Sequence, residues 1–158
     1  MNSRFLFPYT CKIAGLILLV PGLVLAILNF FFNYEPAWLN WKVFAFADVS
    51  FLRGDVYFQV VENNVTNELA GLLMIVSLVF IAFSREKQED ELINKIRLES
   101  LLWATYINYA VLILSLIFLY NFAFLWVLIF NMFTLLVIFN IRYYIMLAKM
   151  KRGLKNEE

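Results

Sequence analysis

The sequence contains no histidine, only one cysteine (Cys11), and almost equal numbers of opposite charges. The lack of histidine excludes the Ser-His-Asp triad, the commonest zinc sites and histidine-ligated haem. A single cysteine rules out an internal disulfide. The 13 Lys and Arg against 12 Asp and Glu give a net charge of +1, which does not favour nucleic-acid binding. Because no glycine-rich phosphate loop or aspartate-rich metal motif occurs either, the sequence predicts a protein without catalytic activity, cofactor or metal.

Apolar residues, by contrast, are abundant: 63% of the chain is hydrophobic and 18% is aromatic, with 17 phenylalanines. A soluble domain of this size has too little interior to bury so much apolar surface. The apolar residues form four runs, each close to the roughly 20 residues that a helix needs to cross about 30 Å of hydrocarbon. These runs are residues 13–32, 65–83, 101–120 and 122–141. The sequence therefore predicts an all-α membrane protein with four transmembrane helices.

We expect the first run to be a retained helix rather than a cleaved signal peptide. Its apolar core exceeds the 7–15 residues typical of a signal sequence, and residues 29–32 (Asn-Phe-Phe-Phe) offer no small-x-small cleavage site. Pro21 predicts a bend within this helix. Gly22 and Ala26 lie four residues apart and predict a face on which another helix packs closely.

The distribution of cations predicts the orientation of the four helices. Only Lys42 and Arg53 lie between the first and second runs. The other connection and the two flanks of the bundle contain Arg4, Lys12, Arg85, Lys87, Lys95, Arg97, Lys149, Lys151, Arg152 and Lys155. By the positive-inside rule, both termini, the 84–100 segment and the 148–158 tail lie in the cytoplasm. The 33–64 connection then faces outward, and a tight turn at residues 120–121 makes the last two helices an antiparallel hairpin.

The outward connection, residues 33–64, is predicted to form a cap. Residues 41–46 and 56–61 are rich in β-branched and aromatic residues, and Arg-Gly-Asp at 53–55 supplies turn chemistry between them, so a short β-hairpin is expected. An isolated hairpin is marginally stable in water and must lean on the membrane or the helices. The favoured interpretation is a cap that lies against the membrane surface, and the alternative is a surface that binds a ligand or a protein.

Polar residues before the second run predict how its helix begins. Asn63 or Asn64 is placed to cap the free N–H groups, and Glu68 lies favourably in the first turn. The tripeptide Asn64-Val65-Thr66 also matches the glycosylation acceptor pattern. The cap is the preferred interpretation.

The segment 84–100 is predicted to be a charged juxtamembrane helix that continues without a break into the third spanning helix. It lacks Gly and Pro, and its apolar residues share one helical face. A solvated helix that fixes register is one interpretation. The other is a docking surface for a cytoplasmic or membrane protein, in which a basic partner binds an acidic patch of Glu86, Glu89, Asp90 and Glu91.

A few polar residues are expected to pair within the last two helices. Counted from the turn at residue 121, Asn108 and Thr134 are each 13 residues away and so reach the same depth. We expect Asn108 to bond either Thr134 or Asn131. Glu99 and Arg142 also lie level with each other near the cytoplasmic boundary, and we expect them to interact. Helix pairing is favoured over a transport pathway. The complete set is Glu99, Asn108, Asn131, Thr134 and Arg142.

Residues 83–91, 96–104, 106–109 and 130–134, together with 63–69, carry a resemblance that extends over nearly the whole chain. The chain resembles a group of uncharacterised small four-helix inner-membrane proteins of Bacteroidota bacteria. The resemblance implies a multi-pass protein of a Gram-negative inner membrane whose outer connection is periplasmic. It implies no activity.

Two function classes follow from the sequence. The first is a non-enzymatic accessory or regulatory membrane protein that engages a partner through its cytoplasmic charged helix. The second is a small pore or transporter that uses the polar residues of the last two helices. Four helices in one chain leave no water-lined face, so the second class requires a homo-oligomer.

Overall fold

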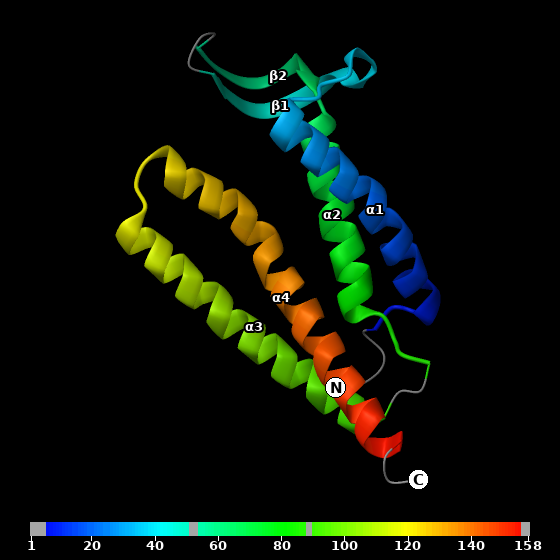
Figure 1. Ribbon diagram of the computed structural model, residues 1–158. Coiled ribbons are helices and arrows are strands. Elements are labelled where there is room, and N and C mark those ends of the chain that lie inside the picture. The colour runs from blue at the N-terminus through cyan, green and yellow to red at the C-terminus, as the bar shows by residue number, and fades with distance from the viewer. Residues whose placement is uncertain (1–5, 51–53, 88–89, 156–158) are drawn as a thin grey trace. The chain divides into compact units, whose positions relative to one another are not determined.

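The computed structural model is mostly helical and describes residues 6–50, 54–87 and 90–155 (Figure 1). In chain order the elements are α1 (Tyr9–Phe32), the short 3₁₀ helix η2 (Ala37–Leu39), β1 (Asn40–Ser50), β2 (Gly54–Asn64), α2 (Thr66–Phe83), α3 (Glu91–Phe118) and α4 (Phe122–Lys155). The chain divides into two compact units, one made of residues 1–19 and 75–158 and the other of residues 20–74. Both α1 and α2 contribute to each unit.

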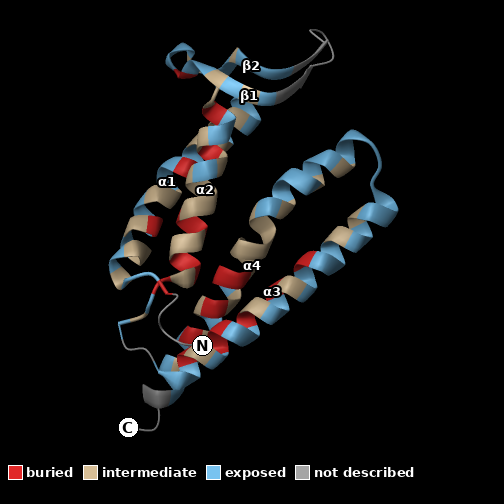
Figure 2. Ribbon diagram, turned by 180° about the vertical axis from the view of Figure 1, so that it is seen from behind, coloured by how far each residue is buried: buried red, intermediate tan, exposed pale blue. Residues whose placement is uncertain are grey.

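All four α-helices are long and apolar enough to cross a membrane. Along residues 109–118 of α3 and 122–138 of α4, which flank the connecting turn, every residue is exposed or only partly buried (Figure 2). These side chains are predominantly Leu, Phe, Ile and Val, and a monomeric soluble protein rarely exposes such a continuous apolar surface. The expectation of four apolar membrane-length helices is therefore confirmed, and the chain is a membrane protein by the length and composition of these helices.

Asparagines with a left-handed backbone stand next to two helix ends. Asn33 follows α1 with φ 46°, and its N–H donates to the carbonyl of Asn29 at 2.9 Å. Asn121 precedes α4 with φ 56°, and its carbonyl accepts from the N–H of Phe124 at 3.1 Å. Asparagine tolerates this conformation better than other non-glycine residues. The predicted tight turn between the last two helices is thus present at residues 119–121.

The prediction of one unbroken helix from residue 84 is wrong, because α3 begins only at Glu91. Asp90 has an extended backbone with φ −126° and ψ 161°, and its carboxylate accepts the N–H of Glu91 at 2.6 Å. Asp90 is therefore the N-cap of α3. Upstream, Ser84 pairs with Phe7 in an isolated parallel β-bridge, so a tertiary contact overrides the helix propensity of this segment.

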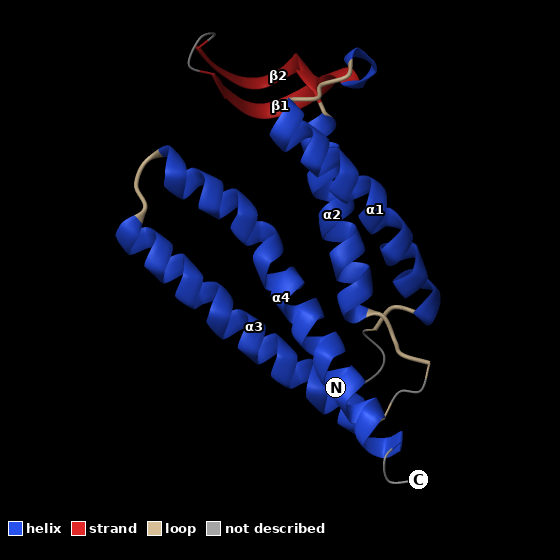
Figure 3. Ribbon diagram, viewed as in Figure 1, coloured by secondary structure: helices blue, strands red, loops and turns tan. Residues whose placement is uncertain are grey.

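The predicted β-hairpin between the first and second apolar helices is present (Figure 3). β1 and β2 pair antiparallel, from Asn40 opposite Asn64 to Ser50 opposite Gly54. Both strands extend beyond the predicted 41–46 and 56–61. Of the predicted turn, Arg53 lies outside the described residues, while Gly54 and Asp55 belong to β2.

Glycines bring α1 and α2 into close contact. A Cβ at Gly22 would lie 3.0 Å from the Cβ of Leu73. A Cβ at Gly15 would lie 2.9 Å from both the carbonyl oxygen of Ser77 and the Cβ of Phe80. The close packing predicted at Gly22 is confirmed, and Gly15 makes a tighter approach that the sequence did not single out.

In the unit that contains α3 and α4, the core lies where the first half of α3 meets the second half of α4. Two aromatic stacks run through it, Phe83 on Phe139 at 5.7 Å and Phe139 on Tyr143 at 5.8 Å between ring centroids. The buried residues of this core are Ala82, Ile93, Ile96, Ala104, Phe139, Tyr143 and Leu147. This core holds the charged and phenolic side chains described next.

Candidate functional site

A β-bridge joins the segment before α1 to the segment after α2. The N–H of Phe7 donates to the carbonyl of Phe83 at 3.0 Å, and the N–H of Arg85 donates to the carbonyl of Phe7 at 2.9 Å. The ring of Phe7 also packs against that of Phe80, 5.3 Å away. The bridge fixes residue 86 beside the first turns of α1, where Lys12 lies.

Lys12 and Glu86 form a largely buried ion pair. Their Nζ and Oε1 atoms are 2.6 Å apart, and the two side chains are only 15% and 9% exposed. The ammonium group also lies over the ring of Tyr144, 4.7 Å from its centroid, while the hydroxyl of Tyr144 donates to the carbonyl of Ile81 at 3.3 Å. Glu86 was predicted to be part of a solvated acidic patch, and that placement is wrong.

Arg97 extends the same cluster from α3. Its side chain is buried, and its Nη2 donates to the hydroxyl of Tyr143 at 3.2 Å and to the carbonyl of Ser84 at 3.3 Å. The hydroxyl of Tyr143 in turn donates to Oε1 of Glu86 at 3.5 Å. We call Lys12, Glu86, Arg97, Tyr143 and Tyr144 the buried junction. It links α1, the α2–α3 connection, α3 and α4 through hydrogen bonds that gain strength in a low dielectric.

From the sequence, Lys12 and Arg97 count only as orientation signals, and Tyr143 and Tyr144 carry no assigned role. One usable signal is position, because Lys12 directly precedes the first predicted span and the two tyrosines follow the last one. Charged side chains at such boundaries are costly to bury unless they are paired. Lys12 and Glu86 are more than 70 residues apart in the sequence, so only the fold shows that they pair.

The acidic patch expected at residues 86–91 is reduced to two described residues at the start of α3. Asp90 and Glu91 are exposed, and Asp90 caps the helix. Glu89 lies outside the described residues. Of the three described members of the patch, Glu86 is therefore withdrawn by its pair with Lys12, while Asp90 and Glu91 stay exposed.

Asn108 of α3 and Asn131 of α4 form the expected amide pair. Nδ2 of Asn131 donates to Oδ1 of Asn108 at 3.1 Å, and Nδ2 of Asn108 donates back at 3.5 Å. Thr134, the other expected partner, instead donates its hydroxyl to the carbonyl of Phe130 at 2.9 Å. Asn108 is 4% exposed, so the pair satisfies polar groups that are otherwise surrounded by apolar side chains.

The expected contact between Glu99 and Arg142 is wrong. Glu99 is exposed. The Arg142 guanidinium lies over the ring of Trp103, with its Cζ 4.7 Å from the centroid, which is a cation–π geometry. Counting residues from the turn placed the two groups at similar depth but did not fix the direction in which each side chain leaves its helix.

Glu99 lines an open groove between the start of α3 and the end of α4. The groove has a volume of about 330 Å³. Its apolar lining comes from Leu92, Ile96, Met146 and Met150, and its charged lining from Lys95, Glu99 and Lys149. This combination of flexible methionines with cations is typical of surfaces that bind an amphipathic segment.

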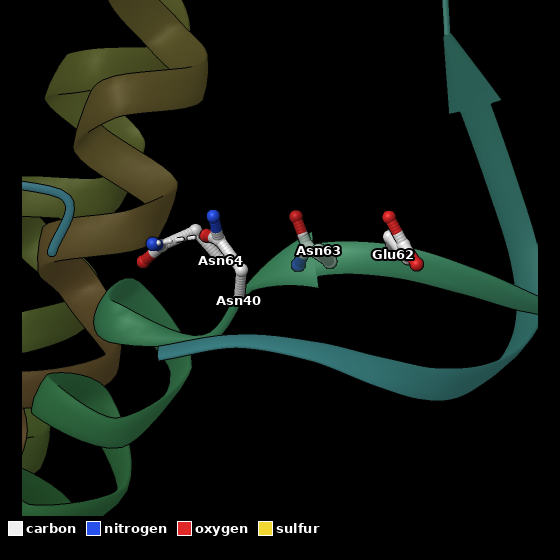
Figure 4. Close-up of a pocket in the computed structure, with 4 residues that line it drawn as sticks. All are labelled: Asn40, Glu62, Asn63 and Asn64. Atoms are coloured by element: carbon white, nitrogen blue, oxygen red, sulfur yellow. Dashed lines mark hydrogen bonds between the residues drawn. The ribbon is translucent and has the colours of Figure 1, made fainter. Parts of the chain in front are cut away.

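A smaller polar pocket of about 250 Å³ lies at the base of the hairpin and is lined by Asn40, Glu62, Asn63 and Asn64 (Figure 4). Nδ2 of Asn64 donates to Oδ1 of Asn40 at 2.6 Å, and Oδ1 of Asn64 accepts the N–H of Thr66 at 3.1 Å. The predicted role of Asn64 in capping α2 is therefore confirmed. Asn63 donates to Glu68 at 3.0 Å, which ties the same strand end to the first turn of the helix.

In the described part of the chain, no group of three His, Cys, Asp or Glu side chains is placed to hold a metal ion. The chain matches no protein-family model, no curated protein and no solved structure.

Proposed function

We propose that the protein is a non-enzymatic accessory or regulatory subunit of a bacterial inner membrane, with both termini in the cytoplasm. The asymmetry of the cations supports this orientation, and the four apolar helices support a membrane location. In this arrangement the groove between α3 and α4 faces the cytoplasm, and the hairpin faces the periplasm.

The observation that carries the proposal is the exposed apolar surface at the start of α3. Leu92 lines the groove and is 46% exposed. At a rise of about 1.5 Å per residue, it lies roughly 14 Å before the predicted start of the span at residue 101. Met150 lies an equal number of residues beyond the predicted end of the last span at residue 141. The apolar lining thus lies outside the spans predicted at 101–120 and 122–141, which supports a protein partner rather than lipid tails as its occupant.

The occupant that fits the groove is an amphipathic helix from a partner protein, with acidic residues beside its apolar face. Lys95 and Lys149 outnumber Glu99 in the groove lining, and Lys151 and Arg152 are exposed further along α4. Charge complementarity of this kind speeds association and selects partners. Apolar contact with the methionines supplies the binding surface.

Photo-crosslinking in intact membranes tests this proposal. A photoreactive residue at position 92 is expected to capture one identified protein, whereas the same residue at Tyr106, which is 66% exposed on the apolar middle of α3, captures none of it. Charge reversal at Lys95 and Lys149 is expected to remove the crosslink. Charge reversal at Lys42, an exposed lysine of the hairpin, serves as the matched control and leaves it intact. Equal capture from positions 92 and 106, or a crosslink insensitive to Lys95→Glu with Lys149→Glu, overturns the proposal.

The alternative, a small oligomeric pore or transporter, has weaker support. Asn108 and Asn131 bond each other, and Thr134 bonds the backbone of its own helix. Polar groups that satisfy one another in this way act as interhelical contacts. Conductance in liposomes that disappears with Asn108→Leu would favour the pore over the subunit.

A further inference from the structure

One face of the β-hairpin carries a cluster of exposed aromatic side chains. In the antiparallel register Phe44 stands opposite Val60, and alternation along each strand places Phe46 and Phe58 on the same face. The ring centroids of Phe44 and Phe46 are 5.3 Å apart, and those of Phe46 and Phe58 are 5.8 Å apart. We call Phe44, Phe46, Phe58 and Val60 the aromatic face. Their side chains are 56%, 70%, 69% and 63% exposed, respectively.

The backbone at the centre of this face is unusual. Phe58 has φ 53°, a left-handed conformation that is rare for a bulky residue. The paired register also omits the step at which Phe46 would face Phe58. The hairpin thus departs from regular strand geometry where two phenylalanine rings meet on one side. Such departures cluster where a surface makes functional contacts.

The opposite face of the hairpin differs in composition. Alternation places Val43 and Ala45 there beside Val61 and Gln59, with Trp41 and Tyr57 further along the same face. Val43, Ala45 and Val61 are partly buried, Gln59 is exposed and polar, and Trp41 and Tyr57 are 55% and 57% exposed. The opposite face therefore mixes smaller and polar groups with two separated aromatic rings, whereas the three phenylalanines of the aromatic face are contiguous.

The base of the hairpin is attached directly to the helices that are suited to span the membrane. Asn64 ends β2 and its side chain caps α2, which begins at Thr66. On the other side, α1 ends with Phe31 and Phe32, which are more than two-thirds exposed. The hairpin turns across the direction of the end of α1 and the start of α2 rather than continuing along it (Figure 1). It therefore extends sideways close to the level at which the two helices end.

We propose that the aromatic face binds the lipid bilayer itself, at the boundary between headgroups and acyl chains. The aromatic face continues from the apolar ends of α1 and α2, which are suited to lie in lipid. This continuity favours lipid as the occupant of the face. Trp38, which is exposed at the base, belongs to the residue type that is enriched at this depth. The phenylalanine rings and Val60 insert among the upper acyl carbons. The Lys42–Glu62 ion pair follows Phe44 and Val60 on the same face toward the base of the hairpin, and its side chains, 75% and 73% exposed, stay in the headgroup region.

Site-directed spin labelling of the full chain in nanodiscs of phosphatidylethanolamine and phosphatidylglycerol tests this proposal. Cys11→Ser removes the single cysteine, and a nitroxide is then attached at position 46 on the aromatic face or at position 59 on the opposite face. The label at 46 is expected to collide several-fold more with dissolved oxygen than with a water-soluble nickel chelate. The label at 59 is expected to show the reverse preference.

A label at position 60 provides a second measurement on the aromatic face, in case loss of the Phe46 ring perturbs the hairpin. Equal nickel accessibility at positions 60 and 59 overturns the proposal. Spin–spin broadening at 46 or 60 that disappears on dilution with unlabelled protein also overturns it, because it identifies a second copy of the chain as the occupant.

Discussion

Two ion pairs in the described part of the chain allow a matched test of how much burial contributes to stability. Lys12–Glu86 has side chains 15% and 9% exposed, whereas Lys42–Glu62 has side chains 75% and 73% exposed. Both pairs join a lysine to a glutamate. Replacement of each glutamate by glutamine therefore makes the same chemical change in two environments.

Glu86→Gln is expected to lower the free energy of unfolding by about 3 kcal/mol, since removal of one partner from a buried pair leaves an uncompensated charge. The estimate sits at the low end for buried pairs because an amide oxygen at position 86 still accepts from Lys12. Glu62→Gln is expected to lower it by less than about 1 kcal/mol, because water solvates both groups of the exposed pair. The two substitutions thus differ by about two orders of magnitude in the folding equilibrium.

Reversible unfolding in mixed dodecylmaltoside and SDS micelles, followed by tryptophan fluorescence and helix circular dichroism, measures both changes. Double-mutant cycles with Lys12→Met and Lys42→Met isolate each pairwise energy. We expect a coupling of about 2 kcal/mol or more for the first pair. Coupling energies for the two pairs that agree within error would refute the claim that the junction is a buried, mutually dependent cluster.

Three further outcomes are expected. Asn108→Leu destabilises the helix hairpin by about 1 kcal/mol in the same unfolding assay, because it leaves the amide of Asn131 without a partner. Adding Asn131→Leu removes that unpaired amide and restores part of the loss, so additive effects of the two substitutions contradict the pairing. Gly15→Ala lowers the free energy of unfolding by about 1–3 kcal/mol, because the new Cβ would lie 2.9 Å from atoms of α2. Gly71→Ala, with open space around its Cβ, leaves that free energy unchanged or raises it. Equal effects of the two substitutions contradict close helix packing. A reporter that functions only in the cytoplasm is expected to be active when fused to the C-terminus. Activity of a reporter that functions only in the periplasm, fused at the same position, contradicts the proposed orientation.

Local patterns in the sequence account for most of the elements. Each apolar run became a helix, because its length and composition suit no other element in lipid. The hairpin followed from two β-prone runs around a glycine. The tight turn before α4 followed from the interruption at residues 120–121, and the left-handed backbone of Asn121 explains why the chain reverses there.

At the start of α3, local sequence patterns do not predict the structure. Residues 84–90 have the composition of a solvated helix, yet a bridge to Phe7 holds Ser84 and Arg85 in an extended conformation. Phe7 lies more than 70 residues earlier in the chain, and no periodicity within the segment records that contact. The same bridge brings Glu86 to Lys12, so one non-local contact explains both the shortened helix and the burial of the carboxylate.

The amide pair and the missing Glu99–Arg142 contact mark a second limit. Counting from the turn gives the depth of a residue along a helix hairpin to within about one turn. Equal depth matched Asn108 with Thr134, yet its partner is Asn131, about one turn nearer the connection, whose side chain faces Asn108. Glu99 points to solvent, whereas Arg142 finds the ring of Trp103 on the neighbouring helix. Pairing therefore requires helix rotation, which the sequence fixes only through the packing of the whole core.

The buried junction also bears on the proposed orientation. Lys12 and Arg97 belong to the cations that the positive-inside rule counts, although both are withdrawn from solvent in the folded chain. That rule depends on cations within about 15–20 residues of a span and not on whether they later become buried. Glu86 offsets charge in the junction after folding but adds little to the orientation signal, because acidic residues contribute weakly to it. The same residues can therefore set the orientation of the chain and then, once paired, hold α1 against α3 and α4.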